Sequence, residues 1–339
     1  MAAHAATPGP PVSTGPGSRA RDSRAASDEV DMCASRPRGR NADEPIVSTP
    51  GGRVSTFIIT TLNGVSYSFI LFLLAAGFSL TFGLMGVLNL AHGALYVLGA
   101  YFGLAIIRQI DSFWLAILVA ALGTGLVGLG IYYFFLRHLH GKPAEQGVLT
   151  IGLGYALANI ILWVWGPFAK MGLTPSLFTG VVRIGDLAFP IYRLVVVGVG
   201  LAVLIVLWWM QDRTRVGAII RAGMDNKEMT RSLGINYGLV STLVFLFGAA
   251  IAGFAGVIGT PILGAFPSMG DALLLLTLMV VVVGGTGFIQ GTMLGALIIG
   301  LLDTFGKAYV PSVALFTSYV IFIVVLLVRP SGLIGRKVF

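Results

Sequence analysis

Cysteine and histidine are scarce in this sequence. Among its 339 residues there is one cysteine, Cys33, and there are four histidines. A single cysteine excludes an internal disulfide and a cysteine-based metal cluster. His138 and His140 lie close together in a polar stretch but lack the further ligands of a metal site. We therefore expect neither a metal nor a cofactor bound by this chain.

Charged residues are also few. They make up 11% of the sequence, whereas a soluble domain averages about 25%. Hydrophobic residues reach 56% and the mean hydropathy is +0.90. This composition excludes most soluble enzymes and indicates an integral membrane protein. The net charge of +8 does not indicate nucleic-acid binding, because the basic residues lie in short connectors, as membrane proteins place them.

The motifs of several enzyme classes are missing. There is no Gly-x-x-x-x-Gly-Lys-Ser/Thr phosphate loop, no His-Glu-x-x-His and no Gly-x-Ser-x-Gly. We therefore expect a chain that is not itself an enzyme, neither an ATPase nor a familiar membrane protease.

Residues 1–55 differ from the rest of the chain. This segment is rich in Ala, Pro, Gly, Ser and Arg, contains no aromatic residue before Phe57, and balances seven Arg against six acids. It cannot bury enough apolar surface to offset its ordering entropy, so we predict a disordered polar tail. No apolar segment of a signal peptide is present in it. A dispensable extension and a regulatory tail are both compatible with this composition.

Residues 56–339 are almost continuously apolar and predict an all-α, polytopic transmembrane helix bundle. A span needs roughly 20 apolar residues. Division at charges, prolines and glycine clusters gives eight or nine spans, because 271–306 is either two helices broken near Gly284, Gly285 and Gly287 or one span with a re-entrant piece. The segments are about 57–82, 90–110, 113–136, 148–166, 190–210, 238–260, 271–287, 288–306 and 312–328.

The distribution of Lys and Arg predicts the orientation. With nine spans, the connectors 137–147 and 211–236 and the C-terminus share one side and carry ten basic residues, against five in the connectors of the other side. The positive-inside rule places the first set in the cytoplasm. Glycines are abundant, 46 in all, and pairs such as Gly99 and Gly103 predict closely packed helices.

Two polar features could carry function. Gly83 and Gly86 permit a helix break before Gly93, and Asn89 and His92 could line or gate a translocation path there, or could satisfy the broken backbone. The connector 211–236 predicts a short amphipathic cytoplasmic helix that could dock into a partner or be an ordinary solvated loop. In that helix Asp225 and Glu228 would lie early and Arg231 late, with Gly234 as its C-cap.

Two acidic residues, Asp271 and Asp303, lie in the predicted spans 271–287 and 288–306. Asp303 and Lys307 are spaced i, i+4, which predicts an ion pair at the membrane edge, with a proton relay as the alternative. Asp271 follows Pro267 and Gly270 and predicts a helix start.

Four collinear stretches resemble one family. They are Phe82-Gly-Leu-Met-Gly-Val-Leu-Asn-Leu-Ala-His-Gly93 with Tyr96 and Gly99-Ala-Tyr101; the loop 221–236 followed by Gly248-Ala-Ala-Ile-Ala-Gly-Phe-Ala-Gly256; Val283-Gly-Gly-Thr-Gly-Phe-Ile-Gln-Gly-Thr-Met-Leu-Gly-Ala296; and Val328-Arg-Pro-Ser-Gly-Leu-Ile-Gly-Arg336. Over about residues 57–337 the chain resembles the branched-chain amino acid ABC transporter permeases, and within them the first of two related permeases.

The resemblance implies a role and partners. It implies a heterodimer with a paralogous permease in the lipid bilayer of the bacterial inner membrane, two cytoplasmic ATPase subunits that bind the ATP, and an extracytoplasmic substrate-binding protein. It also implies that the loop contacts the ATPase, through Arg221, Ala222, Asp225, Glu228, Arg231, Leu233 and Gly234. Alternating access driven by ATP would then move the amino acid inward.

Other functions stay open at this stage. The family includes permeases for urea and short amides, and these motifs do not separate them. A passive channel for a small solute would need no ATPase, which the polar connector argues against. A proton-coupled carrier would need an intramembrane relay, for which His92, Asp271 and Asp303 are the candidates.

Overall fold

The computed structural model describes residues 50–334 except 87, 140–141, 171, 173, 175–177, 185–186 and 330–331. The chain divides into two units, residues 1–52 and 53–339, and the second unit is described below. The predicted polar tail lies outside the described residues up to residue 49. Helix α2 begins at Pro50, so helical structure starts a few residues before the predicted boundary at 56.

Nine long helices within the described residues follow the nine segments predicted from the sequence. They are α2 (Pro50–Met85), α3 (His92–Ile110), α4 (Phe113–Phe134), α5 (Pro143–Trp165), α6 (Ile191–Arg213), α9 (Tyr237–Leu263), α10 (Met269–Gly284), α11 (Ile289–Tyr309) and α12 (Ala314–Val328). Seven of them are long and apolar enough to cross a membrane, while α10 and α12 are shorter apolar helices. The chain is therefore a multi-pass helical membrane protein.

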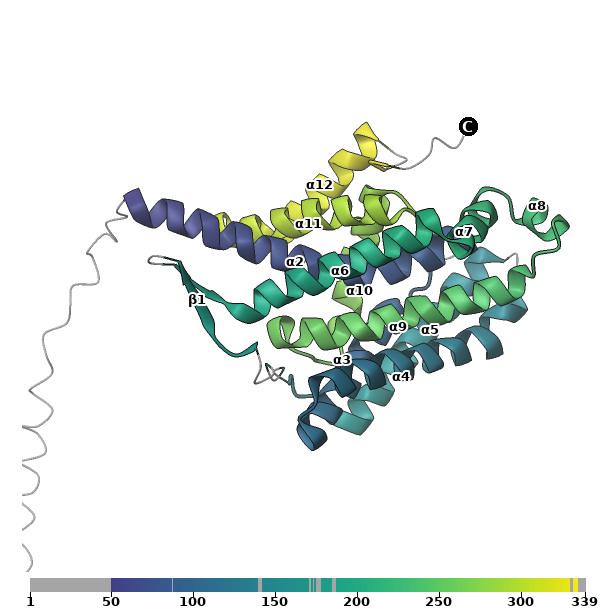
Figure 1. Ribbon diagram of the computed structural model, residues 1–339, viewed down its shortest axis with the longest axis horizontal. Helices are drawn as coiled ribbons and strands as arrows, with labels where there is room; N and C mark the ends of the chain where they lie inside the picture. Colours follow the sequence, from purple (N-terminus) through teal and green to yellow (C-terminus); the bar gives the residue numbers. More distant parts are fainter. Residues whose placement is uncertain are drawn as a thin grey trace, which may run out of the picture. The chain divides into compact units, whose positions relative to one another are not determined.

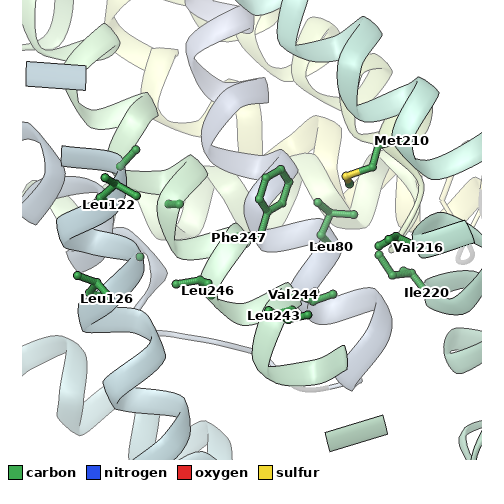
Figure 2. A pocket seen from close by; sticks show the side chains of 13 residues that line it. Leu80, Leu122, Leu126, Met210, Val216, Ile220, Leu243, Val244, Leu246 and Phe247 are labelled. Atoms are coloured by element: carbon green, nitrogen blue, oxygen red, sulfur yellow. The ribbon is translucent and has the colours of Figure 1, made fainter. Parts of the chain in front are cut away.

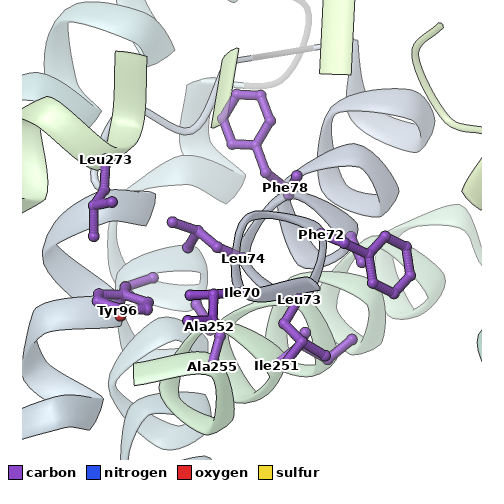
Figure 3. Close-up of a cluster of buried hydrophobic side chains, with 14 of the residues drawn as sticks. Ile70, Phe72, Leu73, Leu74, Phe78, Tyr96, Ile251, Ala252, Ala255 and Leu273 are labelled. Atoms are coloured by element: carbon purple, nitrogen blue, oxygen red, sulfur yellow. The ribbon is translucent and has the colours of Figure 1, made fainter. Parts of the chain in front are cut away.

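Helix α2 lies in the interior of the bundle. Residues 68–81 are all buried, as expected of a helix that is apolar on every side. In Figure 1, α2 runs between α6 and α11, and it packs against both: Phe69 lies against Gly200, and Gly64 against Leu301. Figure 3 shows the core around it, where Ile70, Leu73 and Leu74 lie close to side chains of α3 and α9.

Small residues bring the helices into close contact, as the glycine pattern predicted. A Cβ atom at Gly99 of α3 would overlap the backbone of Gly253 in α9, and one at Gly103 would overlap Val257. Likewise Gly77 of α2 contacts Gly248 of α9. Lipid offers no hydrophobic drive for helix association, so this close backbone packing holds the bundle together.

The connectors lie at the ends predicted for them. The η1 helix (Leu136–Leu139) precedes α5, and the connector after α6 forms α7 (Arg215–Asp225) and α8 (Lys227–Ser232). Lys142 and Lys227 line one pocket, so the connectors 137–147 and 211–236 lie side by side. The C-terminal segment reaches the end of α10, where the backbone N–H of Leu333 donates to the carbonyl of Val283 at 2.8 Å. Both basic connectors therefore lie at one end of the bundle, which we name the cytoplasmic end after the prediction of the positive-inside rule.

One element was not predicted. Before α6 the chain forms an antiparallel pair, β1 (Val181–Ile184) and β2 (Leu187–Pro190), in which Val182 pairs with Phe189. The remaining short element, η3 (Pro311–Val313), leads into α12. A four-residue strand is too short to show a period that distinguishes it from the ends of the neighbouring spans.

Candidate functional site: the cytoplasmic connector and the helix breaks

The cytoplasmic connector forms two short helices where the sequence predicted one. Asn226 separates them: its Oδ1 accepts hydrogen bonds from the N–H groups of Glu228 and Met229, both at 3.0 Å, and so caps α8. The prediction for Asp225 was therefore wrong, because this residue ends α7. Glu228 and Arg231 do occupy the first and last turns of α8, where their charges favour the helix dipole.

Helix α8 ends at Ser232 with Leu233 as its C-cap residue, one position before the predicted cap Gly234. This glycine has φ +79° and its N–H donates to the carbonyl of Arg231 at 2.9 Å, a left-handed termination that glycine adopts without strain. Beside it, Met229 and Leu233 expose 60% and 67% of their surface. Glu228 and Arg231 are exposed as well. The outer surface of α8 is thus a mixture of apolar and charged groups.

Gln211 joins the connector to the break between α10 and α11. Its Nε2 donates to the carbonyl of Gly287 at 2.5 Å, and its Oε1 accepts from the N–H of Ile289 at 3.1 Å. The side chain is buried, and both ends of its amide are used on the backbone of one turn. Sequence analysis missed Gln211; the available signal was a single amide in the last turn of an otherwise apolar span.

Arg221 extends this link into α7. Its Nη1 donates to the carbonyl of Gln211 and lies 3.6 Å from Oδ1 of Asp212. Asp212 Oδ2 also accepts from the indole of Trp208 at 2.6 Å and from the amide of Gln290 at 3.2 Å. The neighbouring Ala222 is half-buried and supplies the carbonyl that ends α7. Helix α7 is therefore fixed to the end of α6 and to α11.

The predicted break at 284–287 is confirmed. Helix α10 ends at Gly284, Gly285 and Gly287 have φ +103° and +80°, and α11 begins at Ile289. A side chain at Gly284 would overlap the carbonyl of Gly291, so the two helices meet at backbone distance. A helix thus lies on each side of the predicted break; α11 is long and apolar enough to cross a membrane, whereas α10 is shorter.

The two predicted breaks lie against each other. A Cβ atom at Gly83 of α2 would overlap the Cα of Gly287, and the methyl group of Met224 in α7 lies at this contact. Ser79 supports it as well, because its Oγ accepts from the N–H of Gly287 at 3.1 Å. The connector thus reaches the point where α2 meets the α10–α11 turn.

A second link joins α8 and α9 to the end of α2. The ammonium group of Lys227 donates to the carbonyl of Met85 at 2.6 Å, and the hydroxyl of Tyr237 donates to the carbonyl of Leu84 at 2.6 Å. Partial burial, together with the nearby charge of Arg231, lowers the pKa of Lys227 below its usual value. These two side chains satisfy carbonyls that the end of a helix leaves without partners.

The break between α2 and α3 uses Asn89 to satisfy its backbone. Gly86 has φ +67°, and the Oδ1 of Asn89 accepts from the N–H of Ala91 at 3.2 Å. Thr150 of α5 bonds to the same segment: its hydroxyl donates to the carbonyl of Leu88 at 3.3 Å and accepts from the N–H of Leu90 at 3.1 Å. Asn89 is buried, so its visible role is to hold this irregular backbone.

His92 is the first residue of α3 and is fully buried. Its Nε2 lies 3.0 Å from the carbonyl of Leu74, and its ring packs edge-on against Phe78. The adjacent Gly93 lies against the carbonyl of Gly270 at the start of α10. Asn89 and His92 do not project from one helical face as predicted, because the helix begins only at His92. Neither lines the two pockets described next.

Among the described residues, an apolar pocket and a polar pocket lie beside the connector helices α7 and α8. The first is an apolar groove of about 470 Å³ between α2, α4, α6, α7 and α9, whose side chains Figure 2 shows as carbon except for the sulfur of Met210. Leu122, Leu126 and Leu243 on its rim are exposed, as is usual for a surface that faces lipid. The second is a polar pocket of about 380 Å³ beside α8.

Comparison with known proteins decides the family. The family model described as "Branched-chain amino acid transport system / permease component" matches residues 60–329. The chain belongs to this family of permeases. The permease is 28% identical to the high-affinity branched-chain amino acid transport system permease protein LivH of Escherichia coli K12, over 83% of its own length and 96% of LivH.

Two further sequence relatives agree with this assignment. The permease is 27% identical to BraD of Pseudomonas aeruginosa, over 81% of its own length and 94% of BraD, and 27% identical to a probable LivH of Methanocaldococcus jannaschii, over 80% and 90%. It also resembles a chain of the solved structure of PsaBC from Streptococcus pneumoniae with a Fab, with 13% identity, a TM-score of 0.46 and coverage of 79% and 91%.

Proposed function

We propose that this permease is the membrane-spanning subunit of an ATP-driven importer of branched-chain amino acids in the bacterial inner membrane. It pairs with a paralogous permease, receives its substrate from an extracytoplasmic binding protein, and contacts two cytoplasmic ATPase subunits that bind the ATP. The relatives' names supply the substrate class. The observation that carries the mechanism is the double link between the connector and the two helix breaks.

The outer surface of α8 is suited to dock a cytoplasmic protein. Met229 and Leu233 offer apolar contacts at the surface of one short helix that also carries charges of both signs. Short helices that present apolar anchors beside charges bind grooves on partner proteins. A solvated loop with no partner gains nothing from exposing two large apolar side chains next to a capped helix.

The links then transmit movement of α7 and α8 into the membrane. Displacement of α7 acts through Arg221 and Gln211 on the turn at Gly287, and displacement of α8 acts through Lys227 on the end of α2. Glycines with positive φ lie at both turns and absorb changes in backbone angle. Tilting α2, α10 and α11 about these turns opens the path alternately to the two sides.

The path itself needs only weak affinity for the amino acid. A zwitterion in the membrane requires water or matched charges around both of its ends. Among the described residues, no three His, Cys, Asp or Glu side chains gather in a group that could hold a metal ion, and Asp303 is paired with Lys307 at 2.5 Å. A hydrated, weakly polar path that receives its substrate from a binding protein fits these observations.

Co-purification tests the proposal. The tagged permease is expressed with the neighbouring genes and isolated in mild detergent. We expect a second multi-spanning permease and cytoplasmic ATPases in the same complex, and uptake of leucine that depends on ATP in reconstituted vesicles. Recovery of the chain alone or as a homo-oligomer, while the neighbours are demonstrably expressed, would contradict the proposal and favour a channel or a secondary carrier.

A further inference from the structure

The polar pocket beside α8 lies at the cytoplasmic end of the bundle. Its walls come from the end of α2, the start of α5, α8 and the start of α9, and its volume is about 380 Å³. This volume exceeds that of a single amino acid side chain and accommodates a small organic molecule with its first waters. The pocket therefore lies between the two basic connectors, 137–147 and 211–236.

Positive charge predominates in this pocket. Lys142, Lys227 and Arg231 line it, against a single carboxylate, Glu228. Lys142 is paired with Glu145 at 3.0 Å, but no ion pair between described residues involves Lys227 or Arg231. The guanidinium of Arg231 lies over the ring of Tyr237, 5.2 Å from its centroid. Such an excess of cationic groups favours a ligand that carries a carboxylate.

Gln146 supplies an acceptor that has no donor. The residue is 97% buried, and its Nε2 donates to the carbonyls of Leu136 and Leu139 at 3.4 and 2.6 Å. These two bonds fix the orientation of the amide. Gln146 is one of the residues that line the pocket, and its buried Oε1 has no hydrogen-bond donor among the described residues. A buried acceptor of this kind is stabilised by a ligand that brings an N–H group.

The rest of the lining is apolar. Met85 and Pro143 contribute aliphatic surface, and Tyr237 contributes its ring. The pocket thus offers cationic side chains that can bind the carboxylate of a ligand. An amide oxygen and the carboxylate of Glu228 can bind its ammonium group, and the apolar wall can hold its side chain. These three features together match an amino acid with an apolar side chain.

We propose that this pocket is a cytoplasmic binding site for the transported amino acid, whose carboxylate binds Arg231 and Lys142 and whose ammonium group binds Gln146 Oε1 and Glu228. The identity of the ligand rests on the proposed function. A ligand held here bridges α8 to α5 and to the end of α2. It restrains the connector, so accumulated product slows further import.

Direct binding tests the site. The full-length permease in nanodiscs of phosphatidylcholine is titrated with L-leucine by calorimetry, and separately with leucinol, which lacks the carboxylate, and N-acetyl-L-leucine, which lacks the ammonium group. We expect saturable binding of one leucine per chain and binding about tenfold weaker for each analogue, since each loses a charge-assisted contact. Acetate is titrated as a control anion. Equal binding heats for leucine and acetate would overturn the proposal, because any small anion would then suffice.

Variants locate the binding. Lys142→Gln and Gln146→Met should each weaken leucine binding about tenfold. Arg137→Gln makes the same charge change in the same connector, where Arg137 stacks on Tyr133 outside the pocket, and should leave binding unchanged. Equal affinities for Lys142→Gln and Arg137→Gln would overturn the assignment. So would loss of leucine binding on adding phosphatidylglycerol, which would identify a lipid headgroup as the occupant.

Transport separates this proposal from the proposed function. In vesicles carrying the assembled transporter, leucine enclosed on the cytoplasmic side should slow uptake by the wild type and have less effect on Lys142→Gln. Uptake that internal leucine leaves unchanged would overturn the feedback site while supporting the importer. Absence of uptake in every variant, with leucine binding intact in nanodiscs, would instead contradict the proposed function.

Discussion

The Nε2 of Gln211 donates to the carbonyl of Gly287 at 2.5 Å, across 76 residues of sequence. The same amide accepts from the N–H of Ile289, so one buried side chain satisfies two backbone groups at the turn between α10 and α11. Gln211 is also the last buried residue of α6 before the cytoplasmic connector. The connector and the break in the membrane are therefore joined by one residue.

Gln211→Leu should uncouple the transporter. The leucine leaves two buried backbone groups without partners, at a cost of about 1–3 kcal/mol each, and removes the link between α7 and the turn. We expect assembled transporter in the membrane, with uptake reduced roughly tenfold per ATP hydrolysed, measured together in vesicles. Gln290→Leu removes an exposed amide 3.2 Å from Asp212 and is the control. Equal uptake in the two variants would show that the link is dispensable.

Gly99→Ala should destabilise the bundle. Its Cβ would overlap the backbone of Gly253, so α3 and α9 must separate, at a cost of about 1–3 kcal/mol. The thermal unfolding midpoint in mild detergent should fall accordingly. Gly130→Ala is the matched control in α4, because no atom lies within 4 Å of the added methyl group. A similar midpoint for both variants would contradict the packing argument.

Gly234→Val should disturb coupling without preventing insertion. The space around Gly234 is open, so the effect comes from its φ of +79°, which costs a β-branched residue about 1–2 kcal/mol or more. We expect normal membrane levels but reduced uptake relative to ATP hydrolysis. Gly234→Asn tolerates the left-handed region better and should retain more coupling. If valine and asparagine behave alike, the backbone conformation of this residue does not matter.

Asp303 and Lys307 should show strong energetic coupling. The Asp303 side chain is 10% exposed and its Oδ2 lies 2.5 Å from the ammonium group of Lys307, as the i, i+4 spacing predicted. Lys307→Met leaves a carboxylate in a poorly hydrated place, whereas Lys307→Met combined with Asp303→Asn removes both charges. A double-mutant cycle by thermal unfolding should give a coupling of about 0.5–3 kcal/mol. Strictly additive losses would rule out a stabilising pair.

His92→Ala should act through folding. The alanine removes the contact between Nε2 and the carbonyl of Leu74 and leaves a cavity beside Phe78. We expect a lower unfolding midpoint and less folded transporter, with unchanged uptake per folded complex. Reduced uptake per complex at an unchanged midpoint would instead support a gating role. Asn89→Ala removes the hydrogen bond from the N–H of Ala91 to Oδ1 of Asn89, and we expect the same result for this variant.

Sequence alone determined the spans. Runs of about 20 apolar residues set the apolar helices, as eight or nine predicted spans, and glycine clusters set the break at 284–287, because helix length and backbone freedom are local properties. The ion pair of Asp303 with Lys307 follows from helical spacing, and the start of α10 near Asp271 follows from Pro267 and Gly270, which are local signals as well. The family motifs were also visible without coordinates.

Tertiary structure decided the relations between distant segments. Nothing local to Gln211 shows that its amide reaches Gly287, and nothing local to Gly83 shows that it lies against that same turn. The split of the connector at Asn226 was missed because a side-chain cap competes with helix continuation, and spacing does not reveal which prevails. The pocket between α5 and α8 likewise depends on long-range packing, which places Gln146 opposite Arg231 although 85 residues separate them.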